Sequence, residues 1–94
     1  MIRGMMTTSS EQYKRFVGDK LRQAREALNL SQSDLAREFN LGDKSKVSHW
    51  ERGLYYPDQF FIFQLYLRKQ IPPSWIYLGD KSQVPYGIAI LLKE

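Results

Sequence analysis

The sequence contains no cysteine and only one histidine, His49. The absence of cysteine excludes disulfides, thiolate metal sites and thiol nucleophiles, and a lone histidine has no second ligand of its kind with which to hold a metal. The sequence has no glycine-rich phosphate loop, and no cluster of histidines and carboxylates has the spacing of a catalytic site. We therefore expect a protein that is not an enzyme, with no catalytic residues, no metal and no cofactor.

Long hydrophobic runs are also absent. The longest apolar run covers residues 88–92, whereas a helix that crosses a bilayer needs about 20 apolar residues. The N-terminus shows no apolar run followed by a small-residue cleavage site, which is the pattern of a signal peptide. The sequence therefore predicts a cytoplasmic protein with no membrane partner. A length of 94 residues predicts a single domain with one modest core.

Positive charge is in excess. The formal net charge is +4, and residues 1–25 carry all of this surplus, with six basic residues against two acidic ones. The rest of the chain balances at eight of each sign. A basic surplus attracts phosphate groups and so favours a nucleic-acid partner, but a surplus of this size is weak evidence by itself.

The chain divides into three parts by composition. Residues 1–9 are rich in Met, Thr and Ser and show no hydrophobic periodicity, which predicts a flexible arm. The alternative is a basic arm that contacts a groove of a nucleic acid through Arg3. Residues 10–80 have helical periodicity. Residues 81–94 form a tail whose apolar run is either a short strand or a short helix. This tail either pairs with its copy in a homodimer or folds back onto its own helices.

Five helices are expected within residues 10–80. Ser10, Ser31 and Asp43 are residues that can cap the starts of three helices, and Pro57 and Pro73 can occupy the first turns of two more. The expected helices cover residues 11–28, 32–39, 44–52, 57–70 and 74–78. The fourth of these is apolar on almost every side, which predicts the central helix of the core.

A tight turn over residues 40–43 separates the second and third helices. Asn40 and Gly42 both tolerate the positive φ that such a reversal needs. The residues of these two helices that helical spacing places toward the core are Leu35, Ala36, Phe39, Val47 and Trp50. The other face of the third helix is polar and is expected to remain outward.

Residues 30–36 (Leu-Ser-Gln-Ser-Asp-Leu-Ala) and 47–53 (Val-Ser-His-Trp-Glu-Arg-Gly) resemble the helix-turn-helix of the phage-repressor and Cro-like (Xre-type) family. In that family Ser-Gln stands at the start of the first motif helix, and Leu-Ala stands in its middle. In the second motif helix an aliphatic residue lies three positions before an aromatic residue, and Glu-X-Gly follows directly. The resemblance covers residues 16–80 and implies an all-α, five-helix, lambda-repressor-like DNA-binding domain. From Gln32 to Trp50 the sequence is one residue longer than the usual motif, and the turn is where the extra residue is expected.

The resemblance also implies a function. It indicates sequence-specific binding of double-stranded operator DNA by a homodimeric transcriptional regulator, a repressor, with residues 44–52 as the recognition helix in the major groove. The alternative on the same fold is an antitoxin or an adaptor, which binds a protein partner such as a toxin. The aromatic side chains of the chain would supply a surface for such a partner.

Site residues are carried over by matching positions to the family motif. The residues at base-facing positions are Lys44, Ser45 and His49. The residues expected to contact DNA phosphates are Gln32, Ser33, Lys46 and Arg52. For Lys46, a solvated helix face is an equal alternative. The family also implies a structural ion pair between Arg25 and Glu51, which would tie the first helix to the recognition helix.

Overall fold

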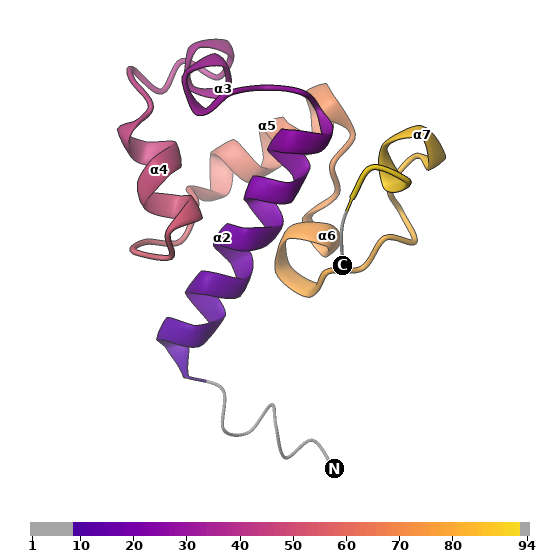
Figure 1. Cartoon of the computed structure of the whole chain (residues 1–94), viewed down its shortest axis with the longest axis horizontal. Coiled ribbons are helices and arrows are strands. Elements are labelled where there is room, and N and C mark those ends of the chain that lie inside the picture. Colours follow the sequence, from indigo (N-terminus) through magenta and orange to yellow (C-terminus); the bar gives the residue numbers. More distant parts are fainter. Residues whose placement is uncertain (1–8, 93–94) are drawn as a thin grey trace.

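The computed structural model of the chain describes residues 9–92, and every regular element in this range is a helix (Figure 1). The helices are α2 (Ser10–Ala27), α3 (Gln32–Glu38), α4 (Ser45–Glu51), α5 (Gln59–Lys69), α6 (Pro73–Leu78) and α7 (Tyr86–Ala89). The expectation of an all-α fold is therefore confirmed. Five of these helices correspond to the expected ones, and α7 follows them in the predicted tail.

The first helix begins one residue earlier than expected, because Ser9 rather than Ser10 is its N-cap. The Ser9 hydroxyl accepts a hydrogen bond from the backbone N–H of Gln12 at 3.0 Å. The Gln12 side-chain oxygen in turn accepts from the backbone N–H of Ser9 at 2.9 Å, which completes a capping box. The rest of the predicted arm, including Arg3, lies outside the described residues.

The central element of the fold is α2, which packs against both α4 and α6. Figure 1 shows α2 crossing the molecule between these two helices. Its inward residues Val17, Leu21 and Ala24 recur at helical spacing and are fully buried. Because it has neighbours on two sides, α2 organises the core.

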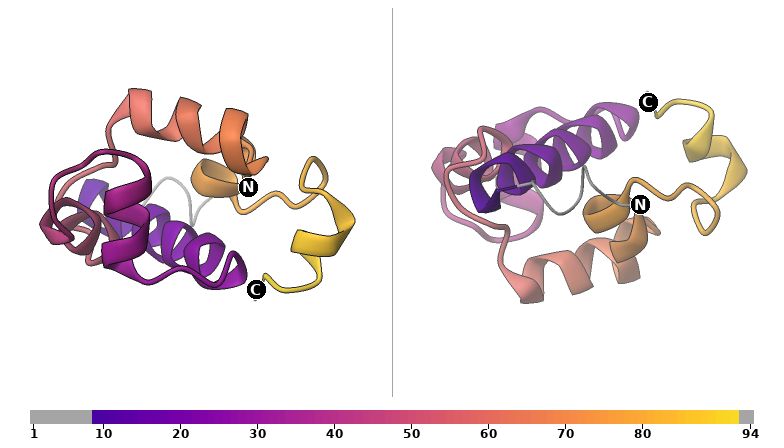
Figure 2. Two further views of the ribbon diagram at one scale, coloured as in Figure 1. Left: turned by 90° about the horizontal axis from the view of Figure 1, so that it is seen from above. Right: turned by 90° about the horizontal axis from the view of Figure 1, so that it is seen from below.

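In contrast, α5 lies at the edge of the molecule. In both views of Figure 2, α5 and α2 form two rows on opposite sides, with α6 between them at one end. The expectation that residues 57–70 form the central core helix is therefore wrong. The helix buries one stripe, Phe61, Ile62 and Leu65, and leaves Phe60, Phe63, Tyr66 and Leu67 exposed. An apolar sequence shows what a helix could bury, but contacts such as those of Phe61 with Phe39 and Trp50 decide which face is covered.

One continuous core joins the helices. Trp75 of α6 is completely buried, and its indole N–H donates to the carbonyl of Lys20 in α2 at 3.0 Å. The buried apolar residues are Val17, Leu21, Ala24, Leu35, Ala36, Phe39, Val47, Trp50, Phe61, Ile62, Leu65, Ile71, Trp75, Ile76, Val84 and Leu92. Within the part of the chain described, no helix has the length and apolar character needed to span a membrane.

The tail folds back onto the domain. Residues 86–89 form α7 rather than a strand, and Val84 and Leu92, which flank it, are buried in the common core. Ile90 and Leu91 stay exposed. The apolar residues that frame the tail therefore have an intramolecular place, which is the second of the two alternatives for this segment.

Candidate nucleic-acid interface

The turn between α3 and α4 contains two left-handed positions. Asn40 has φ 60° and Gly42 has φ 90°. The Leu41 N–H donates to the carbonyl of Ala36 at 2.8 Å, which closes the end of α3. An added Cβ at Gly42 would meet nothing within 4 Å, so the requirement there is for positive φ and not for space.

The N-cap of α4 is Lys44 and not the expected Asp43, although Asp43 still contacts the first residue of the helix. Its carboxylate accepts a hydrogen bond from the backbone N–H of Ser45 at 2.9 Å, and this bond lowers the pKa of Asp43, so the carboxylate is charged at neutral pH. The helix runs over Ser45–Glu51, with Lys44 and Arg52 as its flanking caps. It is thus one residue shorter at each end than the expected 44–52.

The inner side of α4 is fixed by Val47 and Trp50, which are 0% and 3% exposed. The Trp50 ring lies against Phe61 of α5 with centroids 4.9 Å apart. The backbone of α4 also lies against Gly18 of α2. A Cβ added to Gly18 would lie 2.8 Å from the carbonyl oxygen of Glu51 and still closer to the carbonyl oxygen of Trp50. The motif matching did not single out Gly18; the available signal was a glycine inside a helical pattern.

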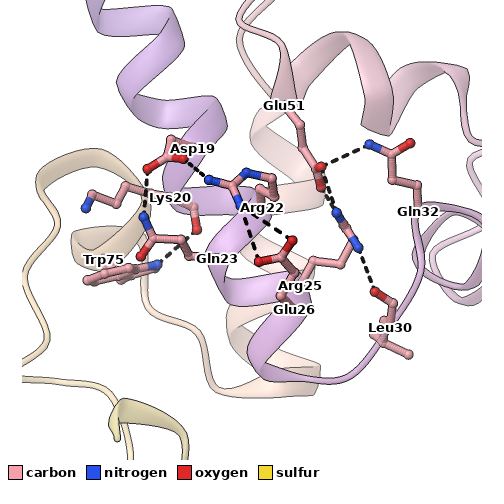
Figure 3. Close-up of polar contacts among 10 residues, drawn as sticks. All are labelled: Asp19, Lys20, Arg22, Gln23, Arg25, Glu26, Leu30, Gln32, Glu51 and Trp75. Carbon is pink, nitrogen blue, oxygen red and sulfur yellow. Dashed lines mark hydrogen bonds and ion pairs between the residues drawn. The ribbon is translucent and has the colours of Figure 1, made fainter. Parts of the chain in front are cut away.

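A buried polar network holds the C-terminal end of α4 (Figure 3). The Arg25 guanidinium reaches both Glu51 carboxylate oxygens, with Nε–Oε2 at 2.7 Å and Nη2–Oε1 at 3.0 Å. Its third nitrogen donates to the carbonyl of Leu30 at 2.8 Å. The Arg25 and Glu51 side chains are only 12% and 4% exposed. The structure thus brings together the two residues that the family resemblance pairs.

Gln32 belongs to the same network. Its side-chain Nε2 donates to Glu51 Oε1 at 3.0 Å, which links the first residue of α3 to the last residue of α4. An amide NH₂ carries two donors, so one N–H of Gln32 is left for another acceptor. This placement gives Gln32 a positioning role that the sequence pattern did not indicate.

The outward residues of the motif gather on one side. Ser33, Lys44 and Ser45 are exposed and line a shallow groove of about 460 Å³, together with Arg37, Gly42 and Asp43. Arg37 was not among the expected site residues. Its side chain is 73% exposed and lies 3.1 Å from Asp34, one helical turn back.

The remaining candidates lie along the rest of α4. His49 is half-buried, and its ring meets Tyr55 edge-on, with centroids 5.9 Å apart. Lys46 is exposed, and its ammonium lies 3.9 Å from the Asp58 carboxylate. Arg52 is exposed at the end of the helix. Lys44, Ser45 and His49 therefore do not form one cluster: Lys44 and Ser45 share the groove, and His49 stands one turn beyond it.

Two basic residues of α2 also border the end of α4, and the motif matching missed them. Arg15 packs against Gly53, where an added Cβ would lie 2.7 Å from the Arg15 Cγ atom. Lys14 lies over the Tyr56 ring at 5.8 Å. They place positive charge beside residues 53–56, which follow α4. In residues 9–92 no group of His, Cys, Asp or Glu could hold a metal ion.

Two short helices joined by a tight turn, with the second held by the core and its polar side outward, define a helix-turn-helix protein. A family model described as helix-turn-helix matches residues 21–65. This match and the relative described next support the resemblance of the chain to the phage-repressor and Cro-like (Xre-type) helix-turn-helix family.

The chain is similar to a curated relative, the HTH-type transcriptional regulator DicA of Escherichia coli (strain K12), with 35% identity over 69 residues. The alignment covers 73% of this chain and 50% of the relative, so the chain spans about half the length of that protein. None of the solved structures gives a significant match to the chain.

Proposed function

We propose that this protein regulates transcription by binding double-stranded DNA sequence-specifically, with α4 as the recognition helix in the major groove. One observation carries the proposal: α4 is anchored on its inner side by Val47 and Trp50 and at its end by Glu51. Its polar side is therefore presented as a rigid unit, and a major groove is wide enough to admit such a helix.

Base reading is assigned to Lys44, Ser45 and His49. Lys44 can donate to the O6 and N7 acceptors of guanine, and the Ser45 hydroxyl can donate or accept. The His49 ring is braced by Tyr55, which limits its rotation and favours one direction for its donor. Lys44 and Ser45 flank the start of α4, and residues near the start of a recognition helix reach deepest into the groove.

Phosphate contacts are assigned to Gln32, Ser33, Lys46 and Arg52. Such contacts position the protein on the duplex without reading its sequence. Gln32 suits this task because its second N–H is left over from the Glu51 contact. The Lys46 ammonium lies 3.9 Å from the Asp58 carboxylate, a long contact with which a phosphate would compete well.

As a repressor, the protein would need only to occupy its operator. It would act in the cytoplasm and bind as a homodimer. Two recognition helices related by a two-fold axis can read a symmetric site whose half-sites lie about 34 Å apart.

A protein-binding role on the same fold, as an antitoxin or an adaptor, is the second candidate. The exposed apolar side chains of α5 favour it, since such patches mark protein contacts.

The test is selection of bound duplexes from a randomised DNA library at two salt concentrations. We expect enrichment of a two-fold symmetric sequence, and we expect Lys44→Ala to relax the preference at one base pair per half-site. Loss of a good base contact lowers affinity by about 5- to 150-fold. Gln83→Ala, an exposed change in the tail, is the control and should bind as the wild type does.

Salt separates the two candidates. Binding through about six to ten phosphates weakens by orders of magnitude between low and moderate salt, whereas an apolar protein contact changes little. Weak binding with no preferred sequence, at every salt concentration tested, would refute the DNA-reading proposal and favour a protein partner.

A further inference from the structure

The N-terminal part of α2 lies directly against the chain just after the end of α4. Gly53 has φ 78°, and a Cβ added to it would lie 2.7 Å from the Cγ atom and 2.9 Å from the Cα atom of Arg15. The stem of the Arg15 side chain therefore passes over Gly53, which is next in sequence to Arg52. Figure 1 shows the N-terminal turns of α2 continuing past the end of α4. The fold thus brings an arginine of the first helix to the end of the helix assigned to the major groove.

The basic residues at this junction have no acidic partner in the described part of the chain. Arg15 and Arg52 are exposed, and no ion pair in residues 9–92 involves either of them or Lys14. Lys14 is half-buried, and its ammonium lies over the Tyr56 ring at 5.8 Å. Glu11, one helical turn before Arg15, also takes part in none of these pairs. The positive charge of the junction is therefore not neutralised within the described chain.

Two other arginines near the motif are neutralised by carboxylates of their own helix. Arg22, two turns further along α2, pairs with both Asp19 and Glu26. Arg37 of α3 pairs with Asp34. At the junction, by contrast, positive charges from two helices meet without a carboxylate between them. Because like charges repel and an anion placed between them attracts both, this arrangement favours a bound anion.

We propose that Arg15 and Lys14 join Arg52 in binding backbone phosphates of the DNA beyond the end of α4. A guanidinium has paired N–H donors that match two oxygens of a phosphate, and the Lys14 ammonium adds charge beside it. Both α2 residues precede residues 21–65, which the family model matches, so this contact belongs to the chain outside the shared motif. The inference rests on the proposed function and extends its phosphate-binding surface to the first helix.

The position of the junction favours phosphates over bases. The residues near the start of a recognition helix reach the base edges, and the junction lies at the opposite end of α4. Cations at that end meet the phosphates that border the groove. Such contacts add affinity and fix the orientation of the protein, but they carry no sequence information. Loss of Arg15 should therefore weaken binding to every sequence alike.

Fluorescence anisotropy on one duplex over a salt series tests the inference. Arg15→Gln should reduce the slope of log affinity against log salt by about 0.9, the value for one lost phosphate contact on duplex DNA. It should also weaken binding roughly tenfold at low salt, as expected for a hydrogen bond between charged groups. Arg15→Lys should keep the slope, because the charge remains, but should recover only part of the affinity, because an ammonium lacks the planar fork.

Lys81→Gln is the matched control, because it also removes one positive charge. Lys81 lies in the segment that leads to α7, and Figure 1 shows α7 and α4 on opposite sides of the molecule. This variant should keep the wild-type salt slope. An equal reduction in both variants would show that only net charge matters and would overturn the inference. Near-ultraviolet circular dichroism of the buried tryptophans Trp50 and Trp75 reports whether each variant is folded. If Arg15→Gln does not fold, Lys14→Gln replaces it.

Duplexes in which single phosphates are replaced by neutral methylphosphonates locate the contact. Each replacement at a phosphate that the wild type contacts should weaken binding. One of these positions should no longer matter in Arg15→Gln, and it should adjoin the position that no longer matters in Arg52→Gln, because both arginines flank Gly53. If Arg15→Gln remains sensitive at every position that affects the wild type, Arg15 holds no phosphate and the inference is wrong.

This inference and base reading by α4 fail separately. A wild type that selects a sequence, together with Arg15→Gln at the full salt slope, would overturn the inference and leave base reading intact. A wild type without a preferred sequence would refute base reading. In that case the salt slope on any duplex still decides the inference: a reduced slope in Arg15→Gln supports the phosphate contact from α2, and an unchanged slope overturns it.

Discussion

The two neighbouring helices α4 and α5 share a buried contact and present opposite chemistry to solvent. Their inner sides meet where the Trp50 ring lies 4.9 Å from Phe61. Outward, α4 carries Ser45, Lys46 and His49. The outward side of α5 is apolar and carries Phe60, Phe63, Tyr66 and Leu67. The comparison separates two tasks: the inner residues fix where each helix lies, and the outer residues decide what each helix binds. Changes on the two sides of each helix should therefore have different effects.

The largest expected effect contrasts the two sides of α5. Phe61→Ala should lower the free energy of unfolding by about 3–5 kcal/mol, because it leaves a cavity between Phe39 and Trp50. Phe60→Ala, one residue away but 70% exposed, should change it by less than about 0.5 kcal/mol. Urea denaturation at low protein concentration, where dimerisation contributes little, measures both. Equal losses would show that α5 is not divided into an inner and an outer side.

The next effect tests how the end of α4 is held. Glu51→Ala should lower the free energy of unfolding by about 3 kcal/mol, because it leaves the Arg25 charge buried without its partner. Glu26→Ala is the control: Glu26 also pairs with an arginine, Arg22, but its side chain is 48% exposed, and exposed pairs contribute about 0–1 kcal/mol. Melting temperatures that fall by the same amount in both variants would contradict a structural role for the Arg25–Glu51 pair.

A smaller effect distinguishes positions along the outer side of α4. Lys46→Ala should weaken binding to all DNA sequences alike and reduce the slope of log affinity against log salt by about 1, as expected for one lost phosphate contact. Lys44→Ala should instead change the preferred sequence. Fluorescence anisotropy on two duplexes that differ at one base pair, over a salt series, separates the two. If Lys46→Ala alters the preference between the duplexes, the phosphate assignment is wrong.

The smallest effect is expected in acid. Hydrogen bonds from the Ser31 backbone N–H lower the pKa of Asp34, and those from Ser45 lower the pKa of Asp43. A carboxylate whose pKa is lowered in the folded state stabilises the fold above its unfolded pKa of about 4, and this contribution is lost as the pH falls through the folded value.

The double variant Asp34→Asn, Asp43→Asn should therefore lose less stability than the wild type between pH 6 and pH 2. Urea midpoints across that pH range, measured side by side, provide the check. Identical acid-induced losses in the two proteins would mean that these helix starts contribute nothing to the pH dependence.

Much of the motif could be predicted because it depends on local chemistry. Ser31 followed by Asp34 forms a capping box, and Val47 and Trp50 lie three residues apart and are buried. Asn40 and Gly42 have the positive φ that their residue types allow. What could not be predicted depends on neighbours distant in sequence. Gly18 matters because the backbone of α4 lies against it, and Gln32 matters because Glu51 is within reach.

The sequence by itself determined five of the helices, the Ser31 cap and the resemblance to a helix-turn-helix family, because each of these follows from residue types at short spacing. Only the tertiary structure decided which face of α5 is covered, where the tail goes and which side chains surround Glu51. These depend on contacts between residues distant in sequence, such as Trp50 with Phe61 and Gln32 with Glu51. Hydrophobicity indicates how much surface a helix can bury, but contact geometry decides which of its sides faces solvent, and in α5 that side carries Phe60, Phe63, Tyr66 and Leu67.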